Sequence, residues 1–467
     1  MGTRMSVPDN SNKAQTKKTN LRRIRAEHIF ALGFLTIILC GAGLLMLPAA
    51  SNSHTVTPFS DTLFTAVSAT CVTGLVVVDT GTHWSLFGQS VILCMIQIGG
   101  LGFMSFALFL LGAIGKRVSP RIRSITAQSF GLESGEGIRR FVKRIFVGTA
   151  VIEGIGALLL MIRTVPLLGV GRGIFAGVFL SVSAFCNAGF DVFGGAVTSP
   201  FSSLVEFGAD PLLLLVFSAL IVLGAAGFLV WNDLWDRLIY KKRMSMYSRF
   251  VLAVTGGLLL GGGVLVAMLE WNNPATLGAL SVPEKLLHAF FQAVTPRTAG
   301  FDAINQTAMR DATKVITMLL MFVGGASGST AGGAKISTVG VMLVSVWATL
   351  RGSREIRVMK RAIPAETVSR AMCILFILLF AIFATALGIV MLDGVSMEAA
   401  LYECFSAYCT VGLSLSLTPT LGLASRLLLC AAMYSGRVGI LTLSFVLLHR
   451  DREEDAVRYP EAKLLIG

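Results

Sequence analysis

The octapeptide Ser68-Ala69-Thr70-Cys71-Val72-Thr73-Gly74-Leu75 has three relatives elsewhere in the chain. They read Ser183-Ala184-Phe185-Cys186-Asn187-Ala188-Gly189-Phe190, Ser406-Ala407-Tyr408-Cys409-Thr410-Val411-Gly412-Leu413 and the more divergent Val294-Thr295-Pro296-Arg297-Thr298-Ala299-Gly300-Phe301. The copies recur at a steady spacing of roughly 110 residues. Each is preceded by an aromatic residue at the same distance from its glycine: Phe64, Phe179, Phe290 and Tyr402. Matched columns at one spacing predict four tandem repeats.

The composition indicates a membrane protein. The 467 residues are 54% hydrophobic and only 14% charged, with a mean hydropathy of +0.76, whereas soluble proteins carry about 25% charged residues. Long apolar runs alternate with basic clusters, which is typical of chains that cross a bilayer several times. We therefore read the net charge of +13 as the bias of Lys and Arg toward cytoplasmic loops, and we expect no nucleic-acid partner.

The first repeat predicts a helix, a half-helix, a loop and a second helix. A basic tail (1–27) precedes the apolar run Ile29–Leu47, the short piece Phe59–Ala69 and the long run Leu86–Ile114. The short piece cannot cross a hydrocarbon core about 30 Å thick, so we expect it to be re-entrant. Pro48-Ala49-Ala50 resembles a signal cleavage site, but the preceding run is long and a motif copy follows directly, which favours an uncleaved helix.

The other three repeats show the same order of segments. Their segments are Phe141–Met161, Gly173–Ala184 and Leu212–Trp231; Phe250–Leu269, Pro283–Val294 and Val315–Leu350; and Val368–Leu392, Ser396–Ala407 and Leu423–Leu448. We expect an all-α polytopic membrane protein with about eight transmembrane helices around a pseudo-fourfold pore. The predicted units are the tail 1–27, the repeats 28–140, 141–246, 247–362 and 363–450, and a C-terminal tail 451–467.

Charge placement gives an independent test of the topology. The joints between repeats are rich in bases: Lys116, Arg117, Arg121, Arg123, Arg139, Arg140, Lys143 and Arg144; Arg237, Lys241, Lys242, Arg243 and Arg249; Arg351, Arg354, Arg357, Lys360 and Arg361. The glycine segments are sparser in bases and carry acids: Asp61, Asp79, Asp191, Asp210, Asp302, Asp393 and Glu398. The positive-inside rule then predicts cytoplasmic joints and termini in the cell membrane, with the glycine loops entering from outside.

The repeated glycine loops predict an ion pathway. Non-helical backbone at membrane depth is tolerated where it lines a watery cavity, and a ring of carbonyl oxygens can replace the water shell of a cation. Glycine allows close approach of the backbone and positive φ. We expect the four motif glycines to form one ion site, the selectivity filter: Gly74, Gly189, Gly300 and Gly412. The expected ligands are the carbonyl oxygens of Val72, Ala188, Ala299 and Val411, with support from Thr73, Asn187, Thr298 and Thr410. The competing interpretation is a set of packing loops with turn glycines.

At these motifs the chain resembles the Trk/Ktr/HKT superfamily of potassium transporters, over roughly residues 28 to 450. One helix before the first loop is more similar to the Ktr-type pore subunit than to the Trk type. The resemblance implies potassium uptake through one pore per subunit, a homodimer, and a cytoplasmic nucleotide-binding RCK ring as regulator. Each loop has one glycine, not the two of a TVGYG channel, which leaves the degree of K⁺/Na⁺ selectivity open.

The same resemblance bears on cofactors. It places the nucleotide on the partner subunit and implies no cofactor in this chain. Potassium is the expected substrate, held by filter carbonyls only. Sodium is a candidate activator, and whether it drives transport or only stimulates it stays open.

A second glycine-rich stretch lies within the long run of the third repeat: Gly324-Gly325-Ala326-Ser327-Gly328-Ser329-Thr330-Ala331-Gly332-Gly333-Ala334-Lys335. So many glycines and small polar residues should break a helix. Close helix packing through small residues is the alternative, although that usually has a sparser spacing. The family resemblance favours an intramembrane gating loop. Because the loop has few large side chains, we expect little packing to oppose its opening.

Arg437 is a charge inside the last apolar run. An arginine at the centre of a membrane helix costs at least about 2.5–3.5 kcal/mol, so it should face a cavity or a partner. We expect it to help hold the gate, with snorkelling to the cytoplasmic edge as the alternative. In the second repeat, Glu153 suggests a structural pair and Arg163 an interfacial position, and Trp231-Asn232-Asp233 suggests a membrane-edge anchor.

Other classes of function fit less well. Eight cysteines without CxxC spacing and five scattered histidines predict neither a disulfide framework nor a metal site. No nucleophile–base constellation indicates an enzyme. No spanning helix carries the regular arginine series of a voltage sensor. The main alternative is a secondary transporter of another cation or a small solute, a class that usually shows inverted repeats.

Overall fold

The computed structural model describes residues 26–102, 105–109, 137–207, 210–353, 355–359 and 361–439. Most of the predicted tail 1–27, all of the tail 451–467 and the end of the fourth repeat lie outside the described residues. The same holds for part of the run Leu86–Ile114 and for six of the basic residues at the joints: Lys116, Arg117, Arg121, Arg123, Arg354 and Lys360.

Each repeat contains a first helix, a short pore helix and a second helix. In the first repeat these are α1 (Ala26–Leu45), α2 (Phe59–Cys71) and α4 (Leu86–Leu101), with the short η2 (Pro48–Ala50) and α3 (Thr80–His83). The second repeat contains α7 (Ile138–Leu168), α8 (Val170–Cys186), η3 (Val205–Phe207), α9 (Pro211–Ala225) and α10 (Phe228–Tyr240). The third contains α11 (Met246–Glu270), α12 (Val282–Val294), η4 (Gln306–Ala308), α13 (Asp311–Phe322) and α14 (Ile336–Leu350), followed by the antiparallel strands β1 (Arg357–Val358) and β2 (Arg361–Ala362). The fourth contains α15 (Ala365–Asp393), α16 (Met397–Tyr408), η5 (Thr418–Thr420) and α17 (Leu423–Val438).

Local sequence signals mark the start of three of the four pore helices, α2, α12 and α16. Pro58 precedes α2. The backbone N–H of Ser281 donates to the Glu284 carboxylate at 2.8 Å in a capping box before α12. The Ser396 side chain accepts the N–H of Ala399 at 3.3 Å before α16. The four short helices therefore lie where the sequence predicted re-entrant segments. The predicted boundary between residues 140 and 141 falls inside the first turn of α7.

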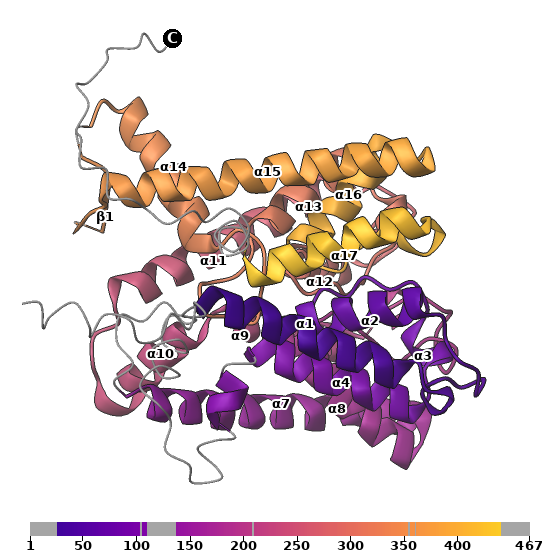
Figure 1. The fold of residues 1–467 in the computed structure, drawn as a ribbon. Coiled ribbons are helices and arrows are strands. Elements are labelled where there is room, and N and C mark those ends of the chain that lie inside the picture. The colour runs from indigo at the N-terminus through magenta and orange to yellow at the C-terminus, as the bar shows by residue number, and fades with distance from the viewer. Residues whose placement is uncertain are drawn as a thin grey trace, which may run out of the picture.

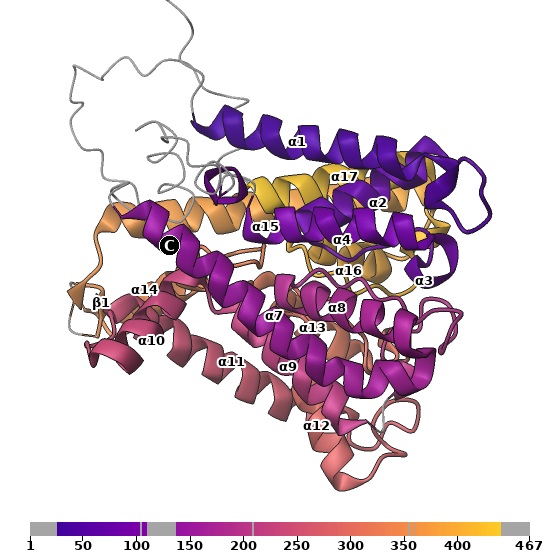
Figure 2. The same cartoon turned by 90° about the horizontal axis from the view of Figure 1, so that it is seen from below.

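The four repeats close into a ring. The second helix of each repeat packs against the pore helix of the next: α4 on α8, α9 on α12, α13 on α16, and α17 on α2. The indigo and yellow ends of the described chain consequently lie side by side, with α1 next to α17 (Figures 1 and 2). This arrangement confirms an all-α polytopic fold and supplies a common axis for the four pore helices.

The second helices of three repeats end earlier than the continuous runs expected for them. Helix α4 ends at Gly102 (φ 80°), α9 gives way to Gly227 (φ 90°) and α17 ends at Gly439 (φ 96°). These positive φ values suit glycine and end a right-handed helix. In the third repeat the break is the longer stretch between α13 and α14. Only that break was visible in the sequence as a glycine-rich insertion.

Length alone identifies fewer spans than the predicted eight. Among the described residues, α7, α11 and α15 are long and apolar enough to cross a membrane, and α9 with α10 makes a fourth span if the 99° bend between them is counted within one. The remaining apolar helices are shorter, in part because the second helices are interrupted. The long helices expose large apolar side chains such as Leu158, Met268 and Phe376, which suits contact with lipid.

The largest hydrophobic cluster lies around the motif copies. Phe64, Phe179 and Tyr402 of the aromatic column are fully buried, and Phe290 is half-buried. The repeated residues thus form the centre of the molecule and not its surface.

Candidate functional site

Each pore helix ends in the same strained turn. Two residues before each motif glycine the backbone is left-handed: Val72 (φ 59°), Asn187 (φ 60°), Thr298 (φ 69°) and Thr410 (φ 50°). Three of these residues are β-branched, a class that rarely adopts positive φ. Such strain costs about 1–3 kcal/mol per residue and persists only where the surroundings impose it. Its presence in all four repeats marks residues 72–74, 187–189, 298–300 and 410–412, the candidate filter loops, as a functional element.

Hydroxyl groups hold the candidate filter loops in this conformation. Ser68 Oγ accepts the N–H of Gly74 at 3.1 Å, and Ser406 Oγ accepts that of Gly412 at 3.0 Å. Ser183 Oγ donates to the Phe190 carbonyl at 2.6 Å, and Thr295 Oγ1 donates to the Phe301 carbonyl at 2.7 Å. These hydroxyls were not among the predicted site residues, although the serine that opens three of the four motifs was a visible signal.

The four glycines form a closed ring. A Cβ added to Gly74 would lie 3.0 Å from the Cα of Gly189, and one added to Gly300 would lie 3.0 Å from the Cα of Gly412. Likewise, a Cβ added to Gly189 would lie 3.2 Å from the Cα of Gly300, and one added to Gly412 would lie 3.0 Å from the Cα of Gly74. All four have positive φ, between 70° and 99°. No residue with a side chain fits these positions, because both the space and the backbone conformation exclude a Cβ.

Carbonyl oxygens accompany this ring. The atom nearest to each missing Cβ is the carbonyl oxygen just before the next glycine: Ala188 for Gly74, Ala299 for Gly189, Val411 for Gly300 and Thr73 for Gly412. The structure therefore exchanges two expected roles in the first repeat. Thr73 supplies the ring carbonyl, and Val72 adopts the left-handed conformation that Asn187, Thr298 and Thr410 share.

A cavity of about 300 Å³ lies against the ring and is lined by all four glycines. Its walls carry three carboxylates, from Asp79, Asp191 and Asp302. Burial, together with the charge of Asp79, raises the pKa of Asp191 to about 7. Burial and the neighbouring Asp191 raise the pKa of Asp302 well above its usual range. We call this cavity the acidic vestibule.

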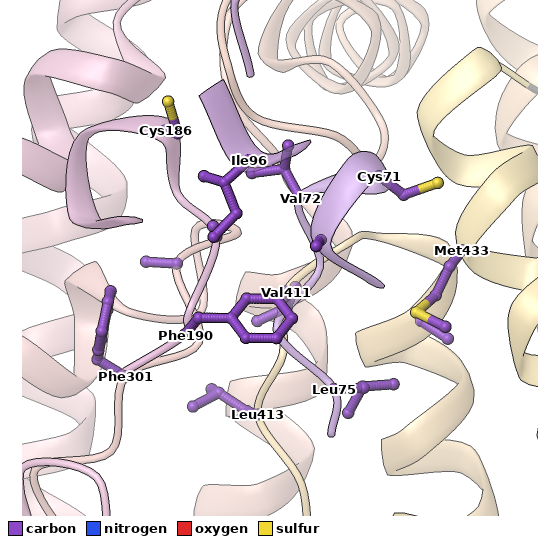
Figure 3. Packing of buried hydrophobic residues seen from close by; sticks show 14 of the residues in the cluster. Cys71, Val72, Leu75, Ile96, Cys186, Phe190, Phe301, Val411, Leu413 and Met433 are labelled. Atoms are coloured by element: carbon purple, nitrogen blue, oxygen red, sulfur yellow. The ribbon is translucent and has the colours of Figure 1, made fainter. Parts of the chain in front are cut away.

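The residues on either side of the glycines lie at opposite ends of the candidate filter loops. Figure 3 shows Leu75, Phe190, Phe301 and Leu413 at one end and Cys71 and Cys186 at the other. The four residues that directly follow the glycines are all buried. Their side chains pack the outer part of the loops, which keeps the ring from collapsing or spreading.

The second candidate element, residues 323–335, forms a narrow hairpin between α13 and α14. The N–H of Gly324 donates to the Ala334 carbonyl at 2.9 Å, and that of Ile336 donates to the Gly325 carbonyl at 3.1 Å. Lys335 Nζ donates to the Ala331 carbonyl at 2.7 Å. The hairpin interrupts the helix as predicted, and we call it the candidate gate loop.

Backbone hydrogen bonds tie the candidate gate loop to the break between α9 and α10. The N–H of Ala326 donates to the Ala225 carbonyl at 3.0 Å, and the N–H of Phe228 donates to the Gly328 carbonyl at 2.9 Å. The expectation that little opposes movement of this loop therefore needs correction. Few side chains hold it, but its backbone groups pair with those freed at the neighbouring break.

The candidate gate loop also reaches the pore helices and filter loops. Thr330 Oγ1 donates to the Phe185 carbonyl at 3.3 Å, at the end of α8. A Cβ at Gly332 would collide with Thr410, and one at Gly333 would lie 3.3 Å from Cys409 Cβ. The loop is thus in contact with the second and fourth repeats on the side of the ring away from the acidic vestibule.

Arg437 joins the candidate gate loop to the first repeat. Its guanidinium donates to the carbonyl of Thr330 in the loop and to the carbonyls of Gly99 and Gly100 at the end of α4, the last at 3.1 Å. Arginine has several donors in a fixed fork and can bridge separate carbonyls. The structure therefore places Arg437 against the loop, where the sequence had also left snorkelling open.

Glu153 and Arg163 of the second repeat both have side-chain partners. The Glu153 carboxylate accepts Gln97 Nε2 at 3.1 Å and lies 3.8 Å from the thiol of Cys186. Arg163 pairs with Asp210 at 2.7 Å, next to the first turn of α9. The partner of Glu153 is thus the neutral amide of Gln97.

Trp231 does more than anchor a membrane edge. Its ring lies 5.4 Å from that of Phe185 at the end of α8, and its indole N–H donates to the Leu223 carbonyl at 3.0 Å. Asn232 accepts Arg144 Nη1 at 2.7 Å, and Asp233 accepts the hydroxyl of Ser248 at 2.6 Å. The segment braces the bend between α9 and α10 from behind.

Sequence reasoning also missed a second set of glycines. Gly99, Gly224 and Gly436 each pack on a carbonyl oxygen at the end of a pore helix, those of Thr70, Phe185 and Tyr408 respectively. A side chain at any of them would push the second helix away from the candidate filter loop. The recurring Gly-x-x-Gly spacing in Gly99–Gly102, Gly224–Gly227 and Gly436–Gly439 was the available signal.

Comparison with known proteins places this geometry in a family. The profile of the family described as "TrkH: Cation transport protein" matches residues 12–455. The chain is 38% identical over 456 residues to the potassium/sodium uptake protein NtpJ of Enterococcus hirae, covering 97% of this chain and 99% of that protein. It is 39% identical over 449 residues to the Ktr system potassium uptake protein B of Bacillus subtilis, covering 95% and 97%.

A solved structure shares the fold. The crystal structure of the potassium transporter TrkH from Vibrio parahaemolyticus matches with a TM-score of 0.70 at 18% identity, over 92% of this chain and 86% of that one. At this identity the likeness concerns the fold alone. The family profile and the two close relatives extend over nearly the whole chain, and they agree with the resemblance found in the four motifs. The chain therefore belongs to the TrkH family of cation transport proteins.

Proposed function

We propose that this protein takes up potassium ions across the cell membrane through one pore, in which the four candidate filter loops form the ion site. The ring of Gly74, Gly189, Gly300 and Gly412 carries this proposal, because four loops far apart in sequence converge on one axis with the same backbone conformation. The names of the relatives, which are uptake proteins for potassium or for potassium and sodium, support transport as opposed to catalysis.

The local physics favours a cation at this ring. The carbonyls of Thr73, Ala188, Ala299 and Val411 are available as ligands for a dehydrated ion. The pore helices end a few residues before the ring, and the C-terminal end of a helix carries a partial negative charge. Those carboxylates of the acidic vestibule that are ionised raise the local concentration of cations before entry. Each of these features would repel an anion.

The candidate gate loop acts as the barrier below the ring in this proposal. It contacts Thr410 of the fourth filter loop and the preceding Cys409, and Arg437 holds it to α4. A backbone segment in the pathway obstructs ions by filling space, and a guanidinium adds an electrostatic barrier to any cation. Opening then requires loss of the contacts of Arg437.

The proposal also covers the orientation of the protein in the membrane and its partners. The described basic joints lie at one end of the molecule, near α10 and β1, and α3 lies at the other (Figure 1). We take the basic end, with both termini, as cytoplasmic. A nucleotide-binding RCK ring docks there on a homodimer, and the "Ktr system" in the name of one relative fits a system of several components. Sodium remains a candidate activator, and the nucleotide belongs to the ring.

Cation flux into liposomes that contain the purified chain tests this function. We expect uptake of potassium down its gradient without any added organic solute. A secondary transporter of an organic solute would instead move cations only when that solute is supplied. Folded protein that gave no potassium flux above empty liposomes would refute the proposal.

A further inference from the structure

Arg297 breaks the fourfold pattern of the motifs. Three residues before the motif glycine the other repeats have a cysteine, namely Cys71, Cys186 and Cys409. Arg297 is only 2% exposed. Its backbone N–H donates to the Val294 carbonyl at 3.1 Å, so the residue continues the last turn of α12. A charged side chain thus lies immediately beside the third candidate filter loop.

Among the residues that the structure describes, no carboxylate pairs with the buried guanidinium. Its Nη1 group meets no hydrogen-bond acceptor in the described part of the chain. A buried, unpaired cation next to a cation pathway is unfavourable for both folding and conduction. If the side chain only had to fill space, a cysteine would do so at a lower free-energy cost, as it does in the other three repeats.

One contact distinguishes Arg297 from those cysteines. Its Nη2 donates to the carbonyl of Gly324 at 3.1 Å. Gly324 begins the first arm of the candidate gate loop, and its own N–H pairs with Ala334 at the base of the second arm. A Cβ at Gly324 would collide with the Gly332 carbonyl, so this point has no freedom to shift by itself. The side chain therefore connects the third filter loop to the base of the gate hairpin.

We propose that Arg297 is a positioning residue that couples the ion filter to the gate. Its charge-assisted hydrogen bond to Gly324 holds filter loop 298–300 in register with the other three loops while the gate hairpin is in place. This inference rests on the proposed filter and gate. Its consequence is that discrimination between potassium and sodium depends on a residue that lies behind the ring and contacts no ion.

The test compares Arg297→Cys, which restores the pattern of the other repeats, with Arg297→Lys, which keeps the charge. Potassium and sodium fluxes are measured in liposomes and normalised to folded protein. We expect Arg297→Cys to lower the K⁺/Na⁺ flux ratio about tenfold, the effect of losing one charge-assisted hydrogen bond. Arg297→Lys, with a single donor group in a different geometry, should fall between Arg297→Cys and the unchanged chain. Arg172→Cys, at an exposed arginine of α8, serves as the matched control.

A double variant tests whether the gate transmits the effect. In a chain that lacks residues 324–333, Arg297→Cys should cause no further loss of selectivity, because its acceptor is already absent. An unchanged flux ratio in Arg297→Cys, or an equal loss with and without the loop, would overturn the inference. If Arg297→Cys does not fold, an unchanged flux ratio in Arg297→Lys has the same meaning. Failure of the loop deletion to raise flux would instead refute the proposed gate itself.

Discussion

The ring of candidate filter loops and the layer of helix breaks beneath it differ in symmetry. At the ring, all four repeats have the same left-handed turn, the same positive-φ glycine and the same neighbouring carbonyl. In the described part of the layer below, the second helices of three repeats end at or next to a positive-φ glycine, whereas the third repeat carries a hairpin between α13 and α14. One layer is repeated and the other is not.

This difference separates two requirements of a gated pore. A dehydrated ion needs equal ligands from every side, so each repeat must contribute the same backbone geometry. A barrier needs one element that can move, and four moving elements would have to move together. The asymmetric residues Arg297 and Arg437 both contact the single hairpin. We infer that the ion ligands reside in what the repeats share, whereas control of the gate, and the support that Arg297 gives to the third filter loop, reside in what only some of them have.

The largest effect is expected when a side chain is added to the ring of the symmetric layer. Changing any of the four ring glycines, for example Gly300→Ser, introduces a Cβ against backbone and strains a positive-φ position. Overpacking and strain together cost about 3 kcal/mol, which predicts a fall in selective potassium uptake of about hundredfold. Potassium and sodium uptake by cells depleted of potassium measures it.

Gly257→Ser is the matched control for this prediction. Gly257 lies in α11 with no atom near its missing Cβ, so the same substitution should be tolerated there. If all four ring variants kept normal uptake and selectivity, the ring would not be the ion site.

The asymmetric layer is tested by removing the residue that holds the hairpin. Arg437→Ala removes donors to the Thr330, Gly99 and Gly100 carbonyls. A charged hydrogen bond contributes about 1.5–3 kcal/mol, so basal potassium flux should rise by about tenfold or more. Deleting residues 324–333 should act in the same direction. Liposome flux without any regulator is the measurement.

Arg370→Ala, at an exposed arginine that pairs with Glu366 on α15, provides the control. A purely structural role for Arg437 makes the opposite prediction. Folded, well-expressed Arg437→Ala protein with lower flux than the unchanged chain would exclude the gate.

A third prediction concerns whether a regulator that binds at the basic end controls the asymmetric layer. Charge reversal at Lys241, Lys242 and Arg243, which follow α10, should weaken docking of the nucleotide-binding ring and reduce its regulation of flux by about threefold, because exposed charges steer and orient association. Co-purification from native membranes and nucleotide-dependent flux are the readouts. Full regulation by the chain alone, with no such subunit retrieved, would contradict this prediction.

The smallest effect is expected at the acidic vestibule. The pKa of Asp191 is raised to about 7, so the side chain gains a proton as the pH falls from 8 to 6, and the vestibule then loses negative charge. Uptake at low potassium should drop by about twofold over this range. Asp191→Asn should give low uptake with a flatter pH profile, whereas Asp311→Asn, at the exposed start of α13, should keep the profile. An unchanged profile in Asp191→Asn would remove Asp191 from ion capture.

Much of this architecture could be predicted from the sequence. Repeated motifs identified the four pore helices to within a few residues, and the glycine-rich stretch identified the hairpin. The place of Thr73 beside the ring was missed although the sequence held the signal, because counting back one residue from each glycine puts Thr73 in the same column as Ala188, Ala299 and Val411. The helix ends at Leu101, Ala225 and Val438 were missed because one glycine in a long apolar run is a weak signal.

By itself, the sequence determined the repeats, the apolar spans and the positions where only glycine fits, because period, length and local backbone conformation depend on neighbouring residues. Only the tertiary structure decided which parts meet. Arg297 reaches Gly324, Thr330 reaches Phe185, and Arg437 joins both Thr330 and α4. Such contacts join residues from separate repeats or elements, and they arise from the packing of the whole helix ring, which no local pattern encodes.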